Sequence, residues 1–209
     1  MKLVTGILIL ASSIAFSAKL GAQEIAPDTL IRNVSNEVLD IVRKDKDIQA
    51  GHTSKAIDLI ESKVLPHFNF MRMTQLAVGK DWRQANSEQQ KTLANEFHTL
   101  LVRTYSKALS EYRNEKITIK PLTLKPEDTD ARVRTEISQA NSGKPIGLDY
   151  YMEKSASGWK VYDIEIGGVS LITNYRETFG SEIRRSGVDG LIKLLQSKNQ
   201  PAEGATAKK

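Results

Sequence analysis

The chain has 209 residues, no cysteine and a formal net charge of +5. This length suits a single domain with a packed core. The lack of cysteine excludes disulfides, thiol catalysis and thiolate metal sites. The basic residues form no dense stripe with interleaved aromatic residues, so the composition does not predict a nucleic-acid-binding protein.

The first residues have the three parts of a secretory signal peptide. Lys2 gives a positive start, an apolar run covers residues 3–16, and small residues follow, so we expect cleavage after Ala22. The run is shorter than the roughly 20 residues that a membrane-spanning helix needs, which favours a removed signal over an anchor. The chain is thus predicted to contain a signal peptide (residues 1–22), a single domain (residues 23–198) and a disordered C-terminal tail (residues 199–209).

Six segments of the expected mature chain show the helical spacing of apolar residues. The first begins at Pro27, and the fourth is capped by the sequence Asn86-Ser87-Glu88 and carries a broad apolar face. Gly187 separates the last two segments. The predicted helices cover residues 27–42, 53–65, 69–78, 86–109, 169–185 and 188–197.

Between the fourth and fifth helices the apolar period changes to two, which is typical of strands with one apolar face. Short links between the strands predict an antiparallel meander, and the helices must cover its apolar face. We therefore predict an α+β fold, a curved antiparallel four-stranded sheet wrapped by helices. Such a half-open cone either fills its interior with side chains or leaves an apolar cavity. The predicted strands cover residues 116–120, 131–137, 146–152 and 158–166.

The sequence carries no clear catalytic pattern. The three histidines show no ligand spacing, and no phosphate loop, nucleophile elbow or zinc-protease motif occurs. Asp163 and Glu165 lie two apart on a predicted strand and so face the same way. This arrangement fits a paired-carboxylate hydrolase, but it also fits a solvated strand face or partners for Lys160 and Arg176. An isomerase with one carboxyl in an apolar cone is a further alternative, because burial raises the pKa of a carboxyl group.

Several segments resemble the sequence pattern of the MlaC family, and they follow the family order over nearly all of the expected mature chain. The departures from this pattern are small: Asn69 stands in place of an acidic residue, and so does Gly167. The matching segments are Val78-Gly79-Lys80-Asp81-Trp82, Ser87-Glu88-Gln89-Gln90, Leu100-Leu101-Val102-Arg103-Thr104-Tyr105, Trp159-Lys160-Val161-Tyr162-Asp163, Gly168-Val169-Ser170-Leu171, Asn174-Tyr175-Arg176 and Gly187-Val188-Asp189-Gly190-Leu191-Ile192.

This resemblance implies a periplasmic phospholipid carrier with a cone like that of nuclear transport factor 2. It implies a shuttle between an outer-membrane lipoprotein–porin complex and an inner-membrane ABC transporter, which maintains outer-membrane lipid asymmetry. Phospholipid is then cargo, and neither a cofactor nor an enzymatic activity is expected. We expect a monomer. A small-molecule isomerase or hydrolase, or a periplasmic adaptor with a filled core, are the alternatives.

If the chain is a carrier, the acyl chains should lie between the sheet and the long helix over residues 86–109, with the headgroup at the mouth. Arg72, Lys80, Arg83 and Arg103 are candidates to flank the mouth or a partner interface. The predicted wall consists of apolar and aromatic side chains from both layers: Phe68, Leu76, Val78, Leu100, Leu101, Tyr105, Val133, Tyr150, Val161, Ile164, Val169, Ile172 and Tyr175.

Overall fold

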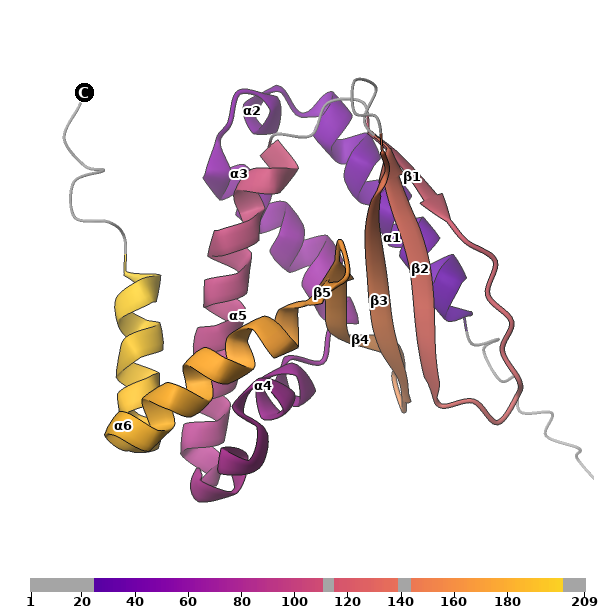
Figure 1. The fold of residues 1–209 in the computed structure, drawn as a ribbon. Helices are drawn as coiled ribbons and strands as arrows, with labels where there is room; N and C mark the ends of the chain where they lie inside the picture. The colour runs from indigo at the N-terminus through magenta and orange to yellow at the C-terminus, as the bar shows by residue number, and fades with distance from the viewer. Residues whose placement is uncertain (1–24, 111–114, 139–143, 201–209) are drawn as a thin grey trace, which may run out of the picture.

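The computed structural model of the chain describes residues 25–110, 115–138 and 144–200. The predicted signal peptide and residues 201–209 of the predicted tail therefore lie outside the described residues. The helices are α1 (Pro27–Lys44), α2 (Lys46–Gln49), α3 (Thr53–Leu59), the π-helix η1 (Ile60–Val64), the 3₁₀-helix η2 (Leu65–His67), α4 (Phe70–Val78), the 3₁₀-helix η3 (Gly79–Gln84), α5 (Ser87–Ser110) and α6 (Leu171–Asn199) (Figure 1). The strands are β1 (Lys116–Ile119), β2 (Asp130–Ser138), β3 (Ile146–Ser155), β4 (Gly158–Ile166) and β5 (Val169–Ser170).

The sheet has five antiparallel strands in the order β1-β2-β3-β4-β5, so the predicted number of four is wrong. The sequence predicts that residue 169 begins a helix, but residues 169–170 pair with the end of β4. Gly167 and Gly168 make this reversal possible, because both adopt positive φ angles, 57° and 87°, that glycine tolerates. The helix α6 begins only at Leu171.

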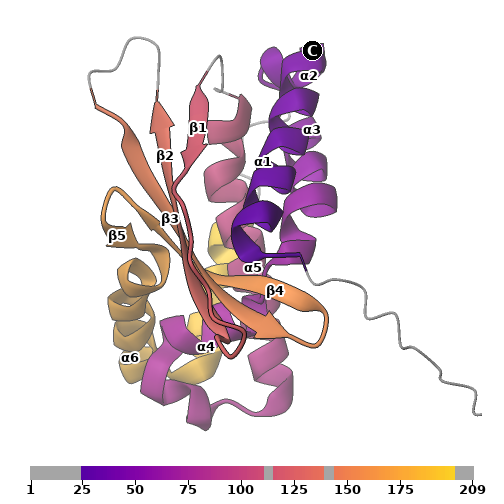
Figure 2. The ribbon, with the colours of Figure 1, turned by 90° about the vertical axis from the view of Figure 1, so that its right-hand side faces the viewer.

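The sheet is open and twisted rather than curled into the predicted cone (Figures 1 and 2). Its two edges, β1 and β5, have only four and two residues, so neither continues far enough to close the sheet. Helices α4, α5 and α6 lie on one side of it in both views, and α1 packs Leu30 and Ile31 against the same face. We call this the inner face. The prediction of an α+β fold with an antiparallel sheet is confirmed.

Side chains on the inner face form four rows across the strands, because directly paired residues point to the same side. The first row is buried beneath α1, whereas the last row reaches solvent. We call the first row the covered end, and the last row together with Val169 the open end. The rows are Ala131–Met152–Val161, Val133–Tyr150–Ile164, Ile119–Thr135–Leu148–Ile166–Val169 and Ile117–Ile137–Ile146.

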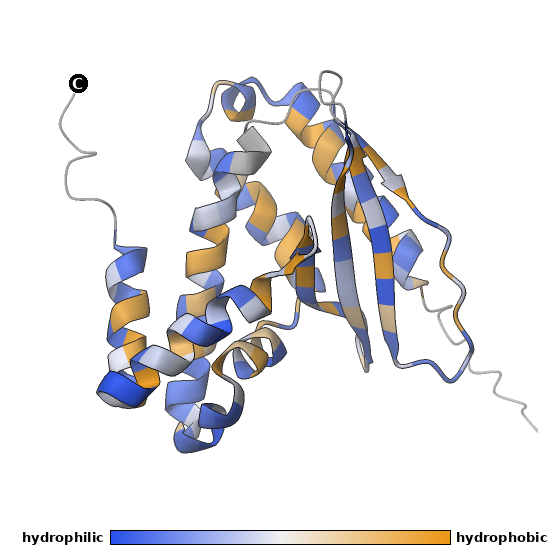
Figure 3. Cartoon of the chain, in the orientation of Figure 1, coloured by the Kyte–Doolittle hydropathy of each residue, from blue (hydrophilic) through white to orange (hydrophobic). Residues whose placement is uncertain are grey.

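The apolar surfaces of α4, α5 and α6 pack together into a helical core, as the hydropathy colouring in Figure 3 illustrates. At its centre the rings of Phe97 and Phe179 meet edge to face, with centroids 5.1 Å apart. The predicted cap of α5 is confirmed. The Asn86 side chain accepts from the backbone N–H of Gln89, and the Gln89 side chain accepts from the backbone N–H of Asn86.

Gly187 divides α6 as the sequence predicts, since its φ of 69° lies outside the helical range. The second half of α6 then runs to Asn199, the first residue of the predicted tail. Over the ranges that the structure covers, no helix combines the length and the apolar character needed to cross a membrane.

Candidate functional site

An apolar pocket of about 210 Å³ lies between the helices and the middle of the inner face. No charged residue lines it, and Tyr105 is the one lining side chain with a polar group. The lining residues come from both layers of the fold, from the π-helix η1 to the start of α6: Ile60, Val64, Leu65, Phe68, Phe70, Met73, Leu101, Val102, Tyr105, Leu148, Ile164, Ile166 and Leu171.

A larger groove, of about 910 Å³, lies on the opposite, outer face, between the β1–β2 connection and the sheet. Its walls include Lys120, Asp128, Asp130, Arg132 and Arg134. Such a polar, open groove offers no burial for an apolar ligand. The smaller apolar pocket is therefore the candidate site.

The chain between α3 and α4 builds one wall of the pocket. In the widened π-helical turn η1, Ile60 and Val64 both reach the pocket, and such turns often occur at functional sites. The following segment is tied to the sheet, because the backbone N–H of Asn69 donates to the carbonyl of Val161 at 2.8 Å. The Asn69 side chain also caps α4, so this residue holds α4 and its wall residues against β4.

The structure brings four of the thirteen predicted wall residues together in the pocket: Phe68, Leu101, Tyr105 and Ile164. Eight others lie away from the pocket lining, within the packed cores. The helical core contains Leu76, Val78, Leu100, Ile172 and Tyr175, and the core beneath α1 contains Val133, Tyr150 and Val161. Val169 lies in neither core and is 59% exposed.

The sequence interpretation missed nine lining residues, some of which carried a usable signal. Leu148 and Ile166 follow from the period-two alternation of their strands, and Phe70 and Met73 belong to a helix that is unusually crowded with apolar residues. The position of η1 in the pocket wall had no such signal, because periodicity shows which side of an element is apolar and not what that side contacts.

Titratable groups near the pocket are held in their neutral forms. Burial lowers the pKa of His98, whose ring packs on Phe70 with centroids 4.7 Å apart. Burial raises the pKa of Tyr105 in the pocket wall, and it raises the pKa of Tyr150 in the next core to about 12. These shifts favour the neutral forms of the three side chains, in keeping with the uncharged lining of the pocket.

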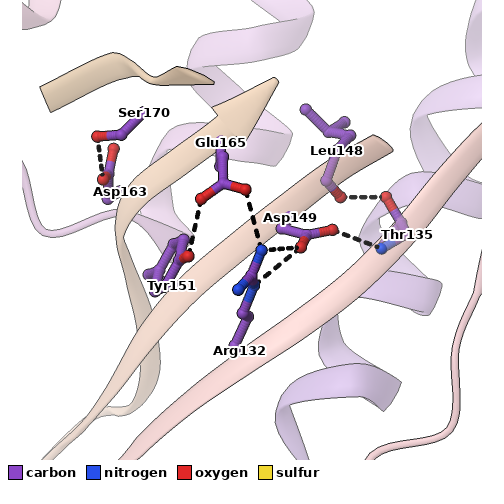
Figure 4. A network of polar contacts seen from close by, with 8 residues as sticks. All are labelled: Arg132, Thr135, Leu148, Asp149, Tyr151, Asp163, Glu165 and Ser170. Atoms are coloured by element: carbon purple, nitrogen blue, oxygen red, sulfur yellow. Dashed lines mark hydrogen bonds and ion pairs between the residues drawn. The ribbon is translucent and has the colours of Figure 1, made fainter. Parts of the chain in front are cut away.

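Asp163 and Glu165, the two candidate carboxylates, lie on the outer face and away from the pocket (Figure 4). Asp163 accepts from the hydroxyl of Ser170 at 2.6 Å and also from the backbone N–H of Ile172, so it joins β4 to the start of α6.

Glu165 is held by Arg132, which donates to it at 2.9 Å, and by the hydroxyl of Tyr151, also at 2.9 Å. Arg132 donates a further hydrogen bond to Asp149 at 2.9 Å and so links three neighbouring strands. Both candidate carboxylates therefore have structural partners, and neither faces an apolar cavity as an isomerase would require.

Two of the four candidate basic residues also have structural partners. Arg72 pairs with Glu153 and lies over the ring of Tyr162 at 3.8 Å, which fastens α4 to the sheet. Arg103 donates to the carbonyl of Asn199 at 2.6 Å and so caps the end of α6. Lys80 and Arg83 are exposed. Within the described part of the chain, no cluster of three or more His, Asp or Glu side chains could hold a metal ion.

Solved and curated proteins resemble the chain over most of its length. A phospholipid-binding protein from Ralstonia solanacearum, solved in complex with a phospholipid, is 39% identical with a TM-score of 0.76, over 82% of this chain and 96% of that one. The intermembrane phospholipid transport system binding protein MlaC of Haemophilus influenzae is 28% identical over 187 residues, 85% of each chain. The toluene tolerance protein ttg2D of Pseudomonas putida is 24% identical over 165 residues, 78% of this chain and 75% of that one.

The sequence model of one protein family, described as MlaC protein, matches residues 32–197. This range runs from within α1 to near the end of α6 and includes all residues that line the apolar pocket. The match confirms the resemblance that the sequence motifs indicate, and the chain belongs to the MlaC family.

Proposed function

We propose that this chain binds phospholipid by its acyl chains in the apolar pocket and carries it across the periplasm. The observation that supports this most directly is a pocket without charged lining residues, in a chain 39% identical to a protein solved with a phospholipid. The donor and acceptor complexes would be an outer-membrane lipoprotein–porin complex and an inner-membrane ABC transporter, with maintenance of outer-membrane lipid asymmetry as the result. Its periplasmic address would come from the predicted signal peptide over residues 1–22.

The physical task of such a carrier is to keep hydrocarbon out of water. Each methylene moved from an apolar site into water costs about 0.8 kcal/mol, so two acyl chains of about 15 carbons would cost roughly 25 kcal/mol. A carrier needs an apolar site that matches the membrane closely, because a much tighter site would not release its cargo. Neutral hydrocarbon walls fit this requirement better than a site with specific polar contacts.

The pocket of about 210 Å³ is smaller than the roughly 300–1,000 Å³ typical of small-molecule sites, so lipid binding requires its walls to separate. The pocket lies where the helical core meets the core beneath α1, and Phe68 packs against both. Separation along this boundary would enlarge the cavity without breaking either core. It would also expose partly buried side chains such as Leu100 and Tyr150 to the cargo.

This movement bears on the predicted wall residues that the closed pocket does not contact. We propose that Phe68, Leu101, Tyr105 and Ile164 contact lipid directly, together with the nine lining residues that the sequence interpretation missed. The buried core residues, such as Val133 and Ile172, would support the wall from behind.

Organic extraction of natively purified protein, followed by mass spectrometry, tests the proposed function. We expect about one phospholipid or more per protein, held without strong headgroup preference because no charged group lines the pocket. The variant Leu148→Trp should lower the lipid content at least fivefold, since the larger side chain fills the space that the cargo needs.

Thr118→Trp is the matched control, because Thr118 is an exposed strand residue on the outer face. It should leave the lipid content unchanged, and thermal unfolding of both variants checks that each is folded. Native protein without lipid would contradict the proposed function. Full lipid content in folded Leu148→Trp would instead contradict the position of the acyl chains.

A further inference from the structure

Exposed apolar side chains lie beside the pocket at the open end of the inner face. Val169 is 59% exposed, Ile146 43% and Tyr105 36%. Tyr105 lines the pocket itself, Val169 is the strand partner of the lining residue Ile166, and Ile146 points to the same side of β3 as the lining residue Leu148. We call Tyr105, Ile146 and Val169 the apolar rim. The apolar lining of the pocket thus continues onto the molecular surface here.

Basic residues lie at the same end of the sheet as this rim. Lys116 begins β1 and Lys144 shortly precedes β3, and the pairing of Ile137 with Ile146 and of Lys116 with Ser138 brings both to the same end of the sheet. Lys107 lies in the last turns of α5, which residues 111–115 connect to β1. All three side chains are exposed, and Glu115 is the one acidic residue within 105–107, 115–117 and 144–146.

An apolar tip with lysines beside it is typical of proteins that rest on anionic membranes. The apolar groups enter the boundary between headgroups and acyl chains, and the lysines remain among the phosphates. Three exposed apolar residues are few for the core of a stable protein–protein interface, which usually buries about 800 Å² on each partner. The rim therefore fits a brief contact with a lipid surface better than a lasting contact with a protein.

We propose that the apolar rim and Lys107, Lys116 and Lys144 seat the protein on an anionic phospholipid surface, so that the pocket opens towards the acyl chains. This proposal rests on the proposed function, because it names the surface with which the same site exchanges lipid. An acyl chain would then pass from bilayer to pocket along apolar side chains and would avoid most of the cost of crossing water.

Co-sedimentation of the full mature chain with vesicles tests the rim independently of lipid content. The probes are vesicles of phosphatidylcholine alone and vesicles with about one third phosphatidylglycerol. We expect binding to the anionic vesicles that falls at least tenfold when salt rises from about 0.05 to 0.5 M. Val169→Asp and Ile146→Asp should each lower that binding at least fivefold. Met71→Asp is the matched control, because Met71 on α4 is 42% exposed, close to the 43% of Ile146.

Uptake of fluorescent phospholipid from the same vesicles links the contact to loading. We expect Val169→Asp to slow uptake at least fivefold, whereas the lipid content of the natively purified variant stays at the wild-type level. Wild-type binding and uptake in both rim variants would overturn the proposal. The proposal would also be overturned if wild-type protein retained lipid natively but neither bound vesicles nor took up lipid without a partner protein. The rim would then serve that partner. Natively purified wild-type protein without lipid would contradict the proposed function. The vesicle-binding assay would then still test whether the rim binds an anionic surface.

Discussion

The two ends of the inner face carry similar side chains but differ in what covers them. At the covered end, Met152 and Val161 are fully buried beneath α1. At the open end, Ile146 is 43% exposed although it alternates along β3 in the same way. One end is a core that stabilises the fold, and the other leads into a pocket and out to solvent. An apolar strand pattern therefore defines one face of the sheet, whereas the neighbouring helices determine whether that face becomes core or binding site.

The largest expected effect is a difference in stability between the covered end and the pocket wall that leads to the open end. Met152→Ala should lower the free energy of unfolding by about 2–5 kcal/mol, because it leaves a cavity in a closed core. Leu148→Ala, four residues earlier on the same face of β3, should cost about 1 kcal/mol, since Leu148 borders the pocket and is not enclosed by packed core on all sides. Denaturant unfolding of lipid-free protein measures both values. Equal losses would mean that the pocket wall is packed as tightly as the covered end.

Asp163 tests how the open end is held in place. Asp163→Ala removes the acceptor for Ser170 and Ile172 and should cost about 1–3 kcal/mol, because it leaves buried donors without partners. Asp163→Asn should recover part of this loss. Glu177→Ala, an exposed change on α6, should stay within about 0.5 kcal/mol. A neutral Asp163→Ala would contradict the structural role, and reduced lipid content at full stability would suggest a role in binding.

The sequence predicted the covered end better than the open end. Alternation in β2, β3 and β4 predicts one apolar face, and four pocket residues follow from it or from the helix pattern: Phe68, Leu101, Tyr105 and Ile164. Predicting the rest required knowledge of how the elements pack. The two-residue strand β5 is too short for a periodic signal, and it depends on the positive φ angles of Gly167 and Gly168. The π-helical turn of η1 likewise follows no residue pattern, so its place in the pocket wall could not be predicted.

Arg132 tests the outer face of the sheet, where it joins β2 to Asp149 on β3 and to Glu165 on β4. Arg132→Ala leaves Asp149 and Glu165, which are 14% and 22% exposed, without their cation and should cost about 1–2 kcal/mol. Lys120→Ala breaks the more exposed pair with Glu136 and should cost less than about 1 kcal/mol. Thermal unfolding compares the two variants. Lipid content should stay at the wild-type level in both, and its loss in Arg132→Ala would mean that the outer face influences the pocket.

His98 is expected to give the smallest effect, a dependence of stability on pH. Burial lowers its pKa in the folded protein, and Glu61 opposes this shift only in part. Above pH 6.5 the imidazole is neutral in both states, so its contribution to stability is complete. As the pH falls below 6.5 the unfolded state binds the proton first, and the folded state loses up to about 1.4 kcal/mol per pH unit until the folded pKa is reached.

Replacement of His98 removes its contribution to the pH dependence of stability. His98→Phe should flatten the fall in unfolding free energy between about pH 6.5 and 5, because phenylalanine packs on Phe70 without a proton to bind. Part of the decrease in unfolding free energy at low pH will persist, since burial and Lys160 also lower the pKa of His67. An unchanged slope in His98→Phe would mean that water reaches His98 in the folded protein, in spite of its packing on Phe70 in the pocket wall.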